Sequence, residues 1–445
     1  MREQETTHDG VTLSQEVTRL AAGTTAAEVR TSLPAGLRAD LDTLLAPVDA
    51  DLAHRYPGDP GTRQPVHTVY VTADQLTADT PRTWGDQALA TLDAHAPDAA
   101  AFAAVLGLDA HLADTVYARV RDKLHREPVE DLRIDFEDGY GTRPDDEEDA
   151  AAARAARLVA EGGARGTWPP YTGVRVKGME APVRARGLRT LDIFLTGLLT
   201  AGGLPPGLQL TLPKVSHPAQ VAAFVRVLDS FEEVHGLPSG RIGFEIQIET
   251  SQAVLAADGT AAVARMIEAA AGRATGLHYG TYDYSAALGV SAAHQASDHP
   301  AADHAKAVMQ VAAAGTGVRV CDGSSNVLPV GDTPRVHHAW RLHHRLVRRA
   351  LARAYYQGWD MHPGQLPTRY AAVFAFYRES LTDAAARLVA YARRTSGDIL
   401  DEPATARALS THLLRGVDCG ALDATEVTRH TGLARPALEA YAGRR

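Results

Sequence analysis

Charged side chains recur at the ends of short β-rich segments of this sequence. They are Asp135, Glu137, Asp138, Glu249 and Asp283 on the acidic side, and Arg175, Lys177 and Lys214 on the basic side. Two carboxylates at neighbouring strand ends suit Mg²⁺, which prefers oxygen ligands and commonly takes only one or two protein carboxylates. An arginine opposite them can bind a substrate carboxylate through two parallel hydrogen bonds. The pattern indicates metal-assisted chemistry on an organic acid, with Glu249 and Asp283 as the metal pair and Arg175 as the anchor.

Eight β-rich segments position these residues, and each precedes a longer stretch of helical periodicity. They are residues 66–72, 132–138, 173–179, 208–214, 242–249, 276–284, 317–323 and 354–363. Strands that alternate with helices in this way form parallel βαβ units. Eight units predict an α/β fold of the (β/α)8 TIM-barrel type, in which the carboxyl ends of the strands converge on one active site. An open doubly wound sheet is the alternative.

Composition divides the chain into three parts. Residues 1–64 are rich in Ala, Leu, Thr and Arg and end in the loop-like RYPGDPGTRQP, which predicts an N-terminal helical extension. Residues 65–366 hold the eight strands and form the predicted barrel. Residues 367–445 predict a C-terminal helical arm, in which a single helix over 368–395 would span about 42 Å. Such an arm could plug the barrel or reach a neighbouring subunit.

Composition also argues against several classes of protein. The 445 residues carry 45 Lys and Arg against 54 Asp and Glu, and this net charge of −9 disfavours a protein dominated by nucleic-acid binding. There is no run of 18 apolar residues and no apolar core of a signal peptide, so we expect no membrane partner and a cytoplasmic location. Cys321 and Cys419 are too few for a disulfide framework. The motifs GxxxxGK(S/T), HExxH and GxSxG are absent.

The order of the motifs resembles that of the citrate lyase β-subunit-like proteins and malyl-CoA lyases, within the wider HpcH/HpaI aldolase and malate synthase group. The similar segments are RIDFEDGYG, GVRVKGME, LTLPKVSHPAQV, FEIQIETSQAVL, GLHYGTYDYSAALG, GWDMHPGQL and ILDEPATARAL. They extend over roughly residues 66–410. The sequence differs from that family in carrying His67 and Thr68 where an Arg-Ser pair is usual, and in a longer stretch between Glu249 and Asp283.

The resemblance implies roles for individual residues. Glu249 and Asp283 would bind Mg²⁺ or Mn²⁺, and Arg175 would bind the substrate carboxylate. Asp401, in ILDEPATARAL, would be the catalytic acid/base residue. In the similar lyases this residue comes from the next subunit of a trimer, so we expect a homo-oligomer, either a trimer or a hexamer. Further residues expected to contact the substrate are Glu137, Asp138, Lys177 and Lys214.

The leading hypothesis is a Mg²⁺-dependent carbon–carbon lyase or Claisen-type condensing enzyme. Its substrate would be a 2-oxo or 3-hydroxy acid, either free or as a CoA thioester similar to malyl-CoA or citramalyl-CoA. Three alternatives stay open: a CoA-independent aldolase that yields pyruvate, a malyl-CoA thioesterase, and a barrel that binds an acid without catalysis. Lys214 could instead form a Schiff base with the substrate, as in metal-free aldolases. We disfavour this mechanism because it gives the carboxylates Glu249 and Asp283 no function. The basic segment 335–353 is either a solvated helix or a contact for an anionic cofactor tail or a partner subunit.

Overall fold

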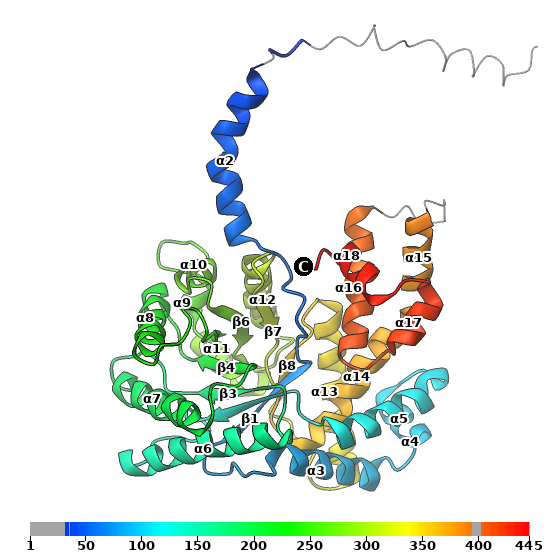
Figure 1. Ribbon diagram of the computed structural model, residues 1–445. Coiled ribbons are helices and arrows are strands. Elements are labelled where there is room, and N and C mark those ends of the chain that lie inside the picture. The colour runs from blue at the N-terminus through cyan, green and yellow to red at the C-terminus, as the bar shows by residue number, and fades with distance from the viewer. Residues whose placement is uncertain (1–31, 35, 394–401, 445) are drawn as a thin grey trace, which may run out of the picture. The chain divides into compact units, whose positions relative to one another are not determined.

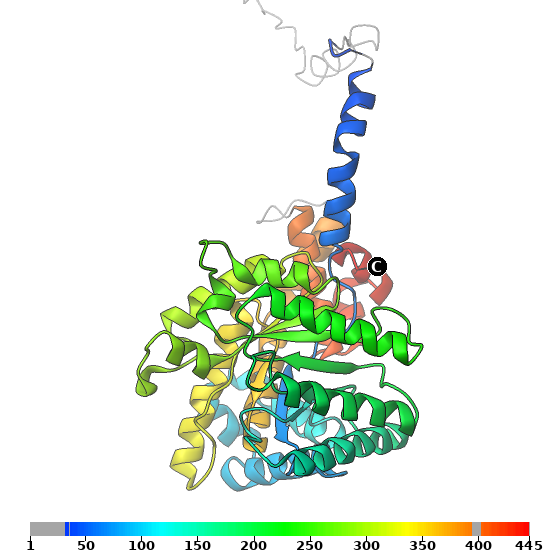
Figure 2. The ribbon, with the colours of Figure 1, turned by 90° about the vertical axis from the view of Figure 1, so that its left-hand side faces the viewer.

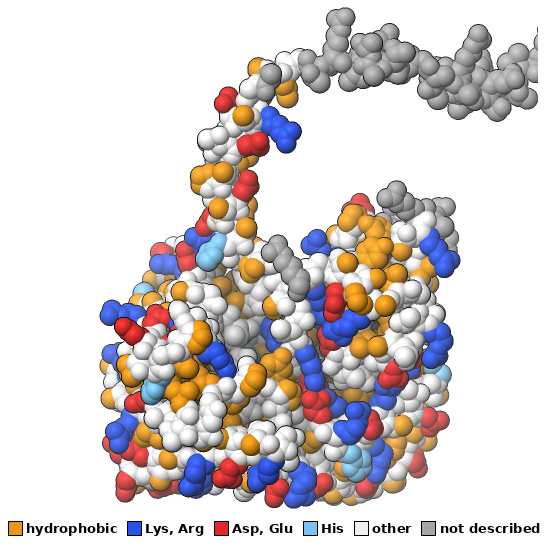
Figure 3. Space-filling view, in the orientation of Figure 1, with side chains coloured by type: hydrophobic (Ala, Val, Ile, Leu, Met, Phe, Trp, Pro, Cys, Tyr) orange, Lys and Arg blue, Asp and Glu red, His pale blue; other side chains and the backbone are white. Residues whose placement is uncertain are grey.

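The computed structural model describes residues 32–34, 36–393 and 402–444. It divides the chain into two compact units, Met1–His54 and Arg55–Arg445. Most of helix α2 (Leu37–Arg55) belongs to the first unit, and none of its residues is buried. Its apolar side chains Leu41, Leu45, Val48 and Leu52 are exposed at the spacing of one helix face, and Figure 3 shows apolar side chains along this helix. The helix therefore presents an apolar stripe on its surface.

The second unit contains eight parallel strands in a nearly closed ring. They are β1 (His67–Thr72), β2 (Asp131–Asp135), β3 (Tyr171–Arg175), β4 (Leu208–Leu212), β5 (Phe244–Ile248), β6 (Ala274–Tyr279), β7 (Arg319–Cys321) and β8 (Gly358–Asp360). Their order is β7-β6-β5-β4-β3-β2-β1-β8, and a single bridge between Cys321 and Gln357 joins the two outer strands. Because consecutive strands are neighbours all around the ring, the predicted (β/α)8 barrel is confirmed and the open doubly wound sheet is wrong.

Helices surround the strands as an outer layer (Figures 1 and 2). In chain order they are α3 (Thr80–His95), α4 (Ala99–Leu106), α5 (Ala110–Arg126), α6 (Asp145–Arg165), α7 (Arg184–Ala201), α8 (Pro218–Val234), α9 (Ser251–Val254), α10 (Ala262–Ala269), α11 (Thr281–Ala287), η2 (Ala292–His294), α12 (Pro300–Ala313), α13 (Thr333–Ala352), η3 (Pro363–Gln365), α14 (Leu366–Glu379), α15 (Leu381–Arg393), α16 (Pro403–Asp418), α17 (Ala424–Thr431) and α18 (Arg435–Ala442). Helix α14 packs against both α13 and α5 and completes the layer after β8. Helices α15 to α18 pack on one another and on α14.

The expected single helix over 368–395 is wrong. The chain forms two helices, α14 and α15, on either side of Ser380. The hydroxyl of Ser380 donates to the carbonyl oxygens of Phe376 (3.2 Å) and Tyr377 (3.4 Å). Such bonds to the preceding turn slightly destabilise a helix and often bend it. Asp401, which this helix was expected to carry beyond the barrel, lies outside the described residues.

Side chains along the strands alternate between two environments, as the pleat of a β-strand requires. On β2, Leu132 and Ile134 are fully buried among the apolar side chains of the core. The alternate residues of the strand, Asp131, Arg133 and Asp135, make their contacts inside the barrel and are also buried. The barrel interior is therefore charged, whereas apolar burial holds the strands to the surrounding helices.

Arg133 is the central cation of the barrel interior. Its Nη2 donates to Asp131 and to Glu245, at 2.8 Å each. Glu245 also pairs with His278 at 3.0 Å, and the ring of His278 accepts a hydrogen bond from the indole of Trp359 at 3.1 Å. Burial works to raise the pKa of Glu245, but Arg133 and His278 together lower it to about 2. This network joins β2, β5, β6 and β8 across the barrel.

No single described helix is both long and apolar enough to cross a membrane. The bent pair α4 and α5, at an angle of 110°, passes the same test of length and composition when taken together. Both helices bury their apolar side chains in the core of the second unit.

We predict that Gly173→Ala will lower the free energy of unfolding by about 3 kcal/mol or more in urea denaturation. Gly173 faces Gln209 where β3 pairs with β4, and an added Cβ would lie 1.5 Å from the carbonyl oxygen of Gln209. The control is Gly163→Ala on α6, where an added Cβ meets nothing within 4 Å. That change should be neutral or stabilising by up to about 1 kcal/mol. Equal stability of the two variants would contradict this account of the strand contact.

Candidate functional site

A cavity of about 820 Å³ opens at the carboxyl ends of the strands. Residues at the strand ends that line it include Tyr70, Thr72, Asp135, Arg175, Gln247, Glu249 and Trp359. The helix α3 and the loop before it supply a second wall, with Gln75, Thr77, Thr80, Thr83, Trp84 and Gln87. The start of α11 supplies a third, with Thr281, Tyr282 and Asp283. Active sites of (β/α)8 barrels lie at this end, so the cavity is the candidate active site.

Most of the residues singled out from the sequence either line this cavity or contact the charged side chains that line it. Arg175 is the last residue of β3, and Glu249 follows β5 directly. Lys214 lies two residues beyond β4, and Glu137 and Asp138 lie in the turn after β2. Ion pairs among these five residues connect the ends of four neighbouring strands.

Asp283 reaches the same cluster, but from a helix. The run 276–284 predicted a strand that ends near Asp283, whereas β6 ends at Tyr279 and Asp283 lies in the first turn of α11. Gly280 allows this change of direction close to β5, since a Cβ at this position would lie 2.5 Å from the Cβ of Glu249. The prediction that Asp283 ends a strand is therefore wrong, although its side chain lines the cavity.

Arg175 is held rigidly at the cavity and is 6% exposed. Its Nε and Nη2 donate to the two carboxylate oxygens of Asp135, at 2.7 and 2.8 Å. The ring centroids of Tyr70 and Trp359 lie 4.8 and 5.9 Å from the guanidinium carbon. Its Nη1 makes two longer contacts, of 3.5 Å with Gln247 and 3.4 Å with Glu137. The Nη1 edge of the guanidinium therefore remains the part best able to bind a ligand.

Asp135 orients Arg175 and was given no role in the sequence analysis. It is paired with Arg175 in the register of β2 and β3. The backbone N–H groups of Glu137 and Gly139 also donate to its carboxylate, at 3.0 Å each. A Cβ on Gly139 would lie 2.7 Å from that carboxylate, which makes glycine necessary here. The position of Asp135 at a strand end marked it as a possible site residue. Its pairing with Arg175 could not be predicted, because it depends on the register of β2 and β3.

Lys214 lies at the centre of four carboxylates. Its Nζ donates to Asp138 at 2.7 Å and to Asp283, and it lies 3.5 Å from Glu137 and 3.9 Å from Glu249. The backbone N–H of Lys214 donates to Glu249 at 2.7 Å. Its φ of +53° is unusual for a residue with a side chain. This backbone conformation lets both the N–H and the ammonium of Lys214 contact the same acidic group.

Burial is the main influence on the ionisation of this cluster. It raises the pKa of Glu249 to about 8 and that of Glu137 to about 7, against the lowering effect of Lys214 and Arg175. Burial also acts to raise the pKa of Asp138, but the hydrogen bond and charge of Lys214 outweigh it and lower the pKa. For Lys214, burial acts to lower the pKa, yet the surrounding carboxylates raise it, so the ammonium stays protonated.

Lys177 does not line this cavity in the structure. Its Nζ donates to the carbonyl oxygen of Phe136 and to the carboxylate of Glu148, each at 2.8 Å. Glu148 is buried in the first turn of α6 and also accepts a hydrogen bond from Thr190. Lys177 therefore ties the end of β2 to α6, beside the candidate site.

Gln247 is a further cavity residue that the sequence analysis overlooked. Its amide donates to Glu249, and its carbonyl oxygen faces Arg175. The alternation in FEIQIE places Glu245, Gln247 and Glu249 on one face of β5, and this pattern could have identified it. No sequence pattern identified the cavity residues of α3. Which of them face the cavity is decided by how the helix packs against the strand ends.

The side chains of this cluster fit a hard divalent cation. Its candidate ligands are all carboxylates, and Mg²⁺ needs only one or two of them from the protein. Glu249 is buried, whereas the side chain of Asp283 is 44% exposed. An ion bound by both residues would therefore have one ligand from the barrel interior and one from the open side of the cavity. In the described part of the chain, no three His, Cys, Asp or Glu side chains form a complete metal-binding group. Glu249 and Asp283 could therefore hold an ion only with substrate or water as further ligands.

Comparisons with known proteins identify one family and several similar structures. The model of a family described as "Domain of unknown function (DUF6986)" matches residues 45–445. No curated protein matches the sequence. CitE from Mycobacterium tuberculosis, solved with magnesium, acetoacetate and coenzyme A, is 18% identical, with a TM-score of 0.46 over 81% of this chain and 99% of that chain.

Two other similar structures come from an archaeon and a bacterium. A Haloferax volcanii malate synthase magnesium/glyoxylate complex is 15% identical, with a TM-score of 0.46 over 85% of this chain and 97% of that chain. An HpcH/HpaI aldolase/citrate lyase family protein from Burkholderia cenocepacia is 17% identical, with a TM-score of 0.35 over 60% of this chain and 89% of that chain.

The raised pKa values of Glu137 and Glu249 predict a pH-dependent stability. A carboxyl group whose pKa is higher in the folded than in the unfolded protein stabilises the fold below its unfolded pKa, and this stabilisation is lost as the pH rises through the folded pKa. We expect the free energy of unfolding, measured in urea with EDTA, to fall as the pH rises from about 5 to about 9. Glu249→Gln cannot ionise and should reduce this fall.

The matched control for this measurement is Asp146→Asn, which changes an exposed acid on α6 and should keep the wild-type slope. An unchanged slope in Glu249→Gln, or a wild-type stability that rises over the same range, would contradict the raised pKa values.

Proposed function

Because the chain belongs to the DUF6986 family, a domain family of unknown function, we propose its function from its own site. It is a Mg²⁺-dependent carbon–carbon lyase or Claisen-type condensing enzyme that acts on a 2-oxo or 3-hydroxy acid. One observation carries the proposal: Arg175, Glu249 and Asp283 line the same cavity at the carboxyl end of the barrel. An anchor for an organic acid and a pair of metal ligands are thus available to one small molecule.

Arg175 is proposed to bind the carboxylate of the substrate. Asp135 already holds Nε and Nη2, so the orientation of the guanidinium is fixed before any ligand arrives. A group that is ordered in advance loses less conformational entropy on binding. The substrate carboxylate would bind at Nη1, which has only the longer contacts with Gln247 and Glu137.

Glu249 and Asp283 are proposed to hold Mg²⁺ or Mn²⁺. When bound, such an ion polarises a 2-oxo group and stabilises the negative charge that develops on its oxygen during carbon–carbon bond making or breaking. Lys214 contacts both residues and has Glu137 and Asp138 as further partners. The lysine therefore supports the acidic cluster.

Proton transfer is proposed for Asp401, on its motif alone. In this proposal the chain forms a trimer or hexamer, and Asp401 of one chain serves the site of a neighbour. Lys214 is not proposed as a Schiff-base nucleophile, because its carboxylate partners raise its pKa and keep it protonated.

A second candidate function is cleavage of a free 2-oxo acid without CoA, and the lining of the cavity favours it. Among the described residues that line the cavity, Arg175 is the only Lys or Arg. One cation matches one carboxylate, whereas CoA carries several phosphate groups as well. The pyruvate-forming aldolase reaction therefore fits the lining better than malyl-CoA hydrolysis does.

The test measures carbon–carbon cleavage and condensation with a panel of 2-oxo acids, 3-hydroxy acids and their CoA thioesters, with Mg²⁺ or with EDTA. We expect activity only with the metal, and a loss of about a hundredfold or more in Glu249→Gln and Asp283→Asn. Both variants should also lose Mg²⁺ binding in calorimetry, while Asp146→Asn keeps it. Full activity in EDTA, or inactivation by borohydride with a 2-oxo acid, would instead support a Schiff base at Lys214.

Arg175→Lys tests the substrate anchor. A lysine ammonium is a point charge and cannot replace the planar guanidinium that Asp135 orients. We expect the KM for the acid to rise about tenfold or more, with a smaller effect on kcat. Arg226→Lys, an exposed position on α8, is the control. An unchanged KM in Arg175→Lys would remove this residue from the substrate site.

A further inference from the structure

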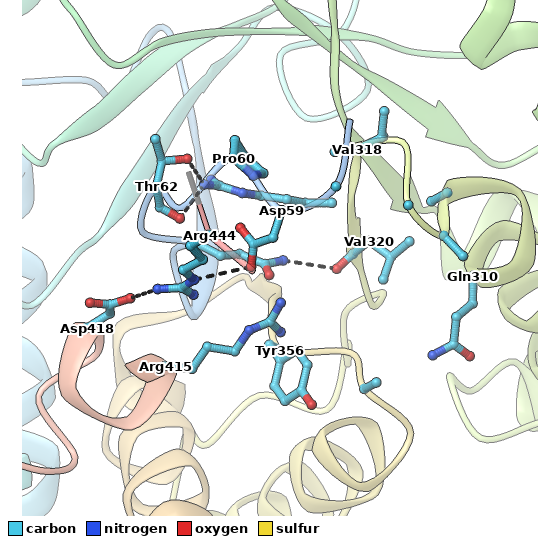
Figure 4. A pocket seen from close by; sticks show the side chains of 18 of the residues that line it. Asp59, Pro60, Thr62, Gln310, Val318, Val320, Tyr356, Arg415, Asp418 and Arg444 are labelled. Carbon is cyan, nitrogen blue, oxygen red and sulfur yellow. Dashed lines mark hydrogen bonds and ion pairs between the residues drawn. The ribbon is translucent and has the colours of Figure 1, made fainter. Parts of the chain in front are cut away.

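A second cavity lies at the opposite end of the barrel from the candidate active site. Its volume is about 290 Å³, and it is lined by Val66 before β1, Arg319 at the start of β7 and Tyr356 before β8. Residues 58–64 and the ends of α12 and α16 complete the lining, and Figure 4 shows it from close by. Because these are the amino ends of the strands, the cavity lies away from the groups proposed to act on the substrate.

Arg415 of α16 lines this cavity with an uncompensated charge. Its guanidinium carbon lies 4.0 Å from the centroid of the Tyr356 ring, and the two side chains lie together in Figure 4. The two acids of the lining, Asp59 and Asp418, instead pair with Arg444, at 3.4 and 3.1 Å. Among the described residues, no carboxylate lies within ion-pair distance of Arg415.

Arg319 is a second cation on the lining that lacks an acidic partner among the described residues. Its Nη2 donates to the carbonyl oxygen of Thr62 at 2.9 Å and to the hydroxyl of the same residue. Two other titratable groups, Tyr377 and Cys419, stay neutral. Burial raises the pKa of the Cys419 thiol to about 12 and that of the Tyr377 phenol well above its ordinary value. With three arginines against two aspartates, the lining keeps a net positive charge.

We propose that this cavity is a binding site for a small anion with a carboxylate or phosphate group, held by Arg415 and Arg319. An arginine that is stacked on an aromatic ring presents its edge in a fixed plane, which suits two parallel hydrogen bonds to such a group. The volume of about 290 Å³ lies just below the range of about 300–1,000 Å³ for ligand pockets, which suits a small ligand. Inorganic phosphate or a short dicarboxylate fits it, and Ala313, Val318 and Ala354 offer apolar surface to a carbon chain.

A bound anion would link three separate parts of the second unit. Arg319 belongs to β7 and is bonded to Thr62 in the segment before β1, while Arg415 belongs to the helices after β8. A ligand that binds only the folded protein stabilises it by mass action. The anion would therefore raise the melting temperature.

The experiment measures binding of inorganic phosphate, succinate and the neutral succinamide to the full chain, by calorimetry and by thermal shift. We expect phosphate or succinate to bind and to raise the melting temperature, and succinamide to do neither. Arg415→Met should weaken binding about tenfold or more, and Arg319→Met should weaken it as well. Arg415→Lys keeps the charge without the planar fork and should bind with intermediate affinity.

Two control variants separate this cavity from other arginine sites. Arg407→Met changes an exposed arginine two turns earlier on α16, and Arg175→Met removes the anchor in the candidate active site. Arg407→Met should keep all of the binding, and Arg175→Met should keep the binding that Arg415→Met weakens. The proposal is overturned if neither anion binds at millimolar concentration, if succinamide binds as well as succinate, or if binding is lost in Arg175→Met but kept in Arg415→Met. If Arg415→Met does not fold, the comparison of Arg319→Met and Arg415→Lys with Arg407→Met decides.

Discussion

Two arginines inside the barrel, Arg133 and Arg175, are each bound by a carboxylate that β2 supplies. Asp131 and Glu245 bind Arg133, and Asp135 binds Arg175 through two hydrogen bonds. A buried charge without its partner costs several kcal/mol, so these pairs must form as the strands pair. In this protein, the closing of the barrel and the assembly of the candidate site therefore depend on the same charge compensation.

Charge inside the barrel lies in two layers, a lower one around Arg133 and an upper one at the carboxyl ends of the strands. In the lower layer, Arg133 and His278 hold the pKa of Glu245 at about 2, whereas burial raises the pKa of Asp131. In the upper layer the carboxylates outnumber the cations, and the pKa values of Glu137 and Glu249 are raised to about 7 and 8. A surplus of negative charge in a buried place destabilises the fold but suits the binding of a cation. At the open end of the barrel, unlike in the interior, a ligand can relieve this surplus.

The sequence was informative wherever periodicity decides the structure. The eight strands, the inward position of Arg175 and the position of Glu249 after β5 all follow from alternation and spacing. The central position of Lys214 could not be predicted, because it depends on a left-handed backbone and on acids from three other segments. The break at Ser380 lies in a stretch of favourable helical composition, and the bonds of its hydroxyl to the preceding turn are of the kind that bends a helix.

The roles of residues that contact neighbouring helices were equally hard to predict. Lys177 resembles a strand-end residue of the site, yet the acidic first turn of α6 binds it instead. Asp283 resembles a strand-end carboxylate, yet it begins a helix. In both cases the residue type indicated a charged group near the site, but its contacts could not be predicted. Contacts between elements are set by packing rather than by spacing along the chain.

The ring of strands has one weak seam, between β7 and β8, where a single bridge closes it. The firm partner of β8 is β1, with three paired positions, although the whole barrel separates these strands in sequence. During translation, β1 therefore has an open hydrogen-bonding edge until residues 358–360 have left the ribosome. Such an edge is a template for pairing with other chains, and synthesis at ribosomal rates keeps it open for many seconds. For this protein, the period of greatest exposure to aggregation is set by the time needed to synthesise the barrel.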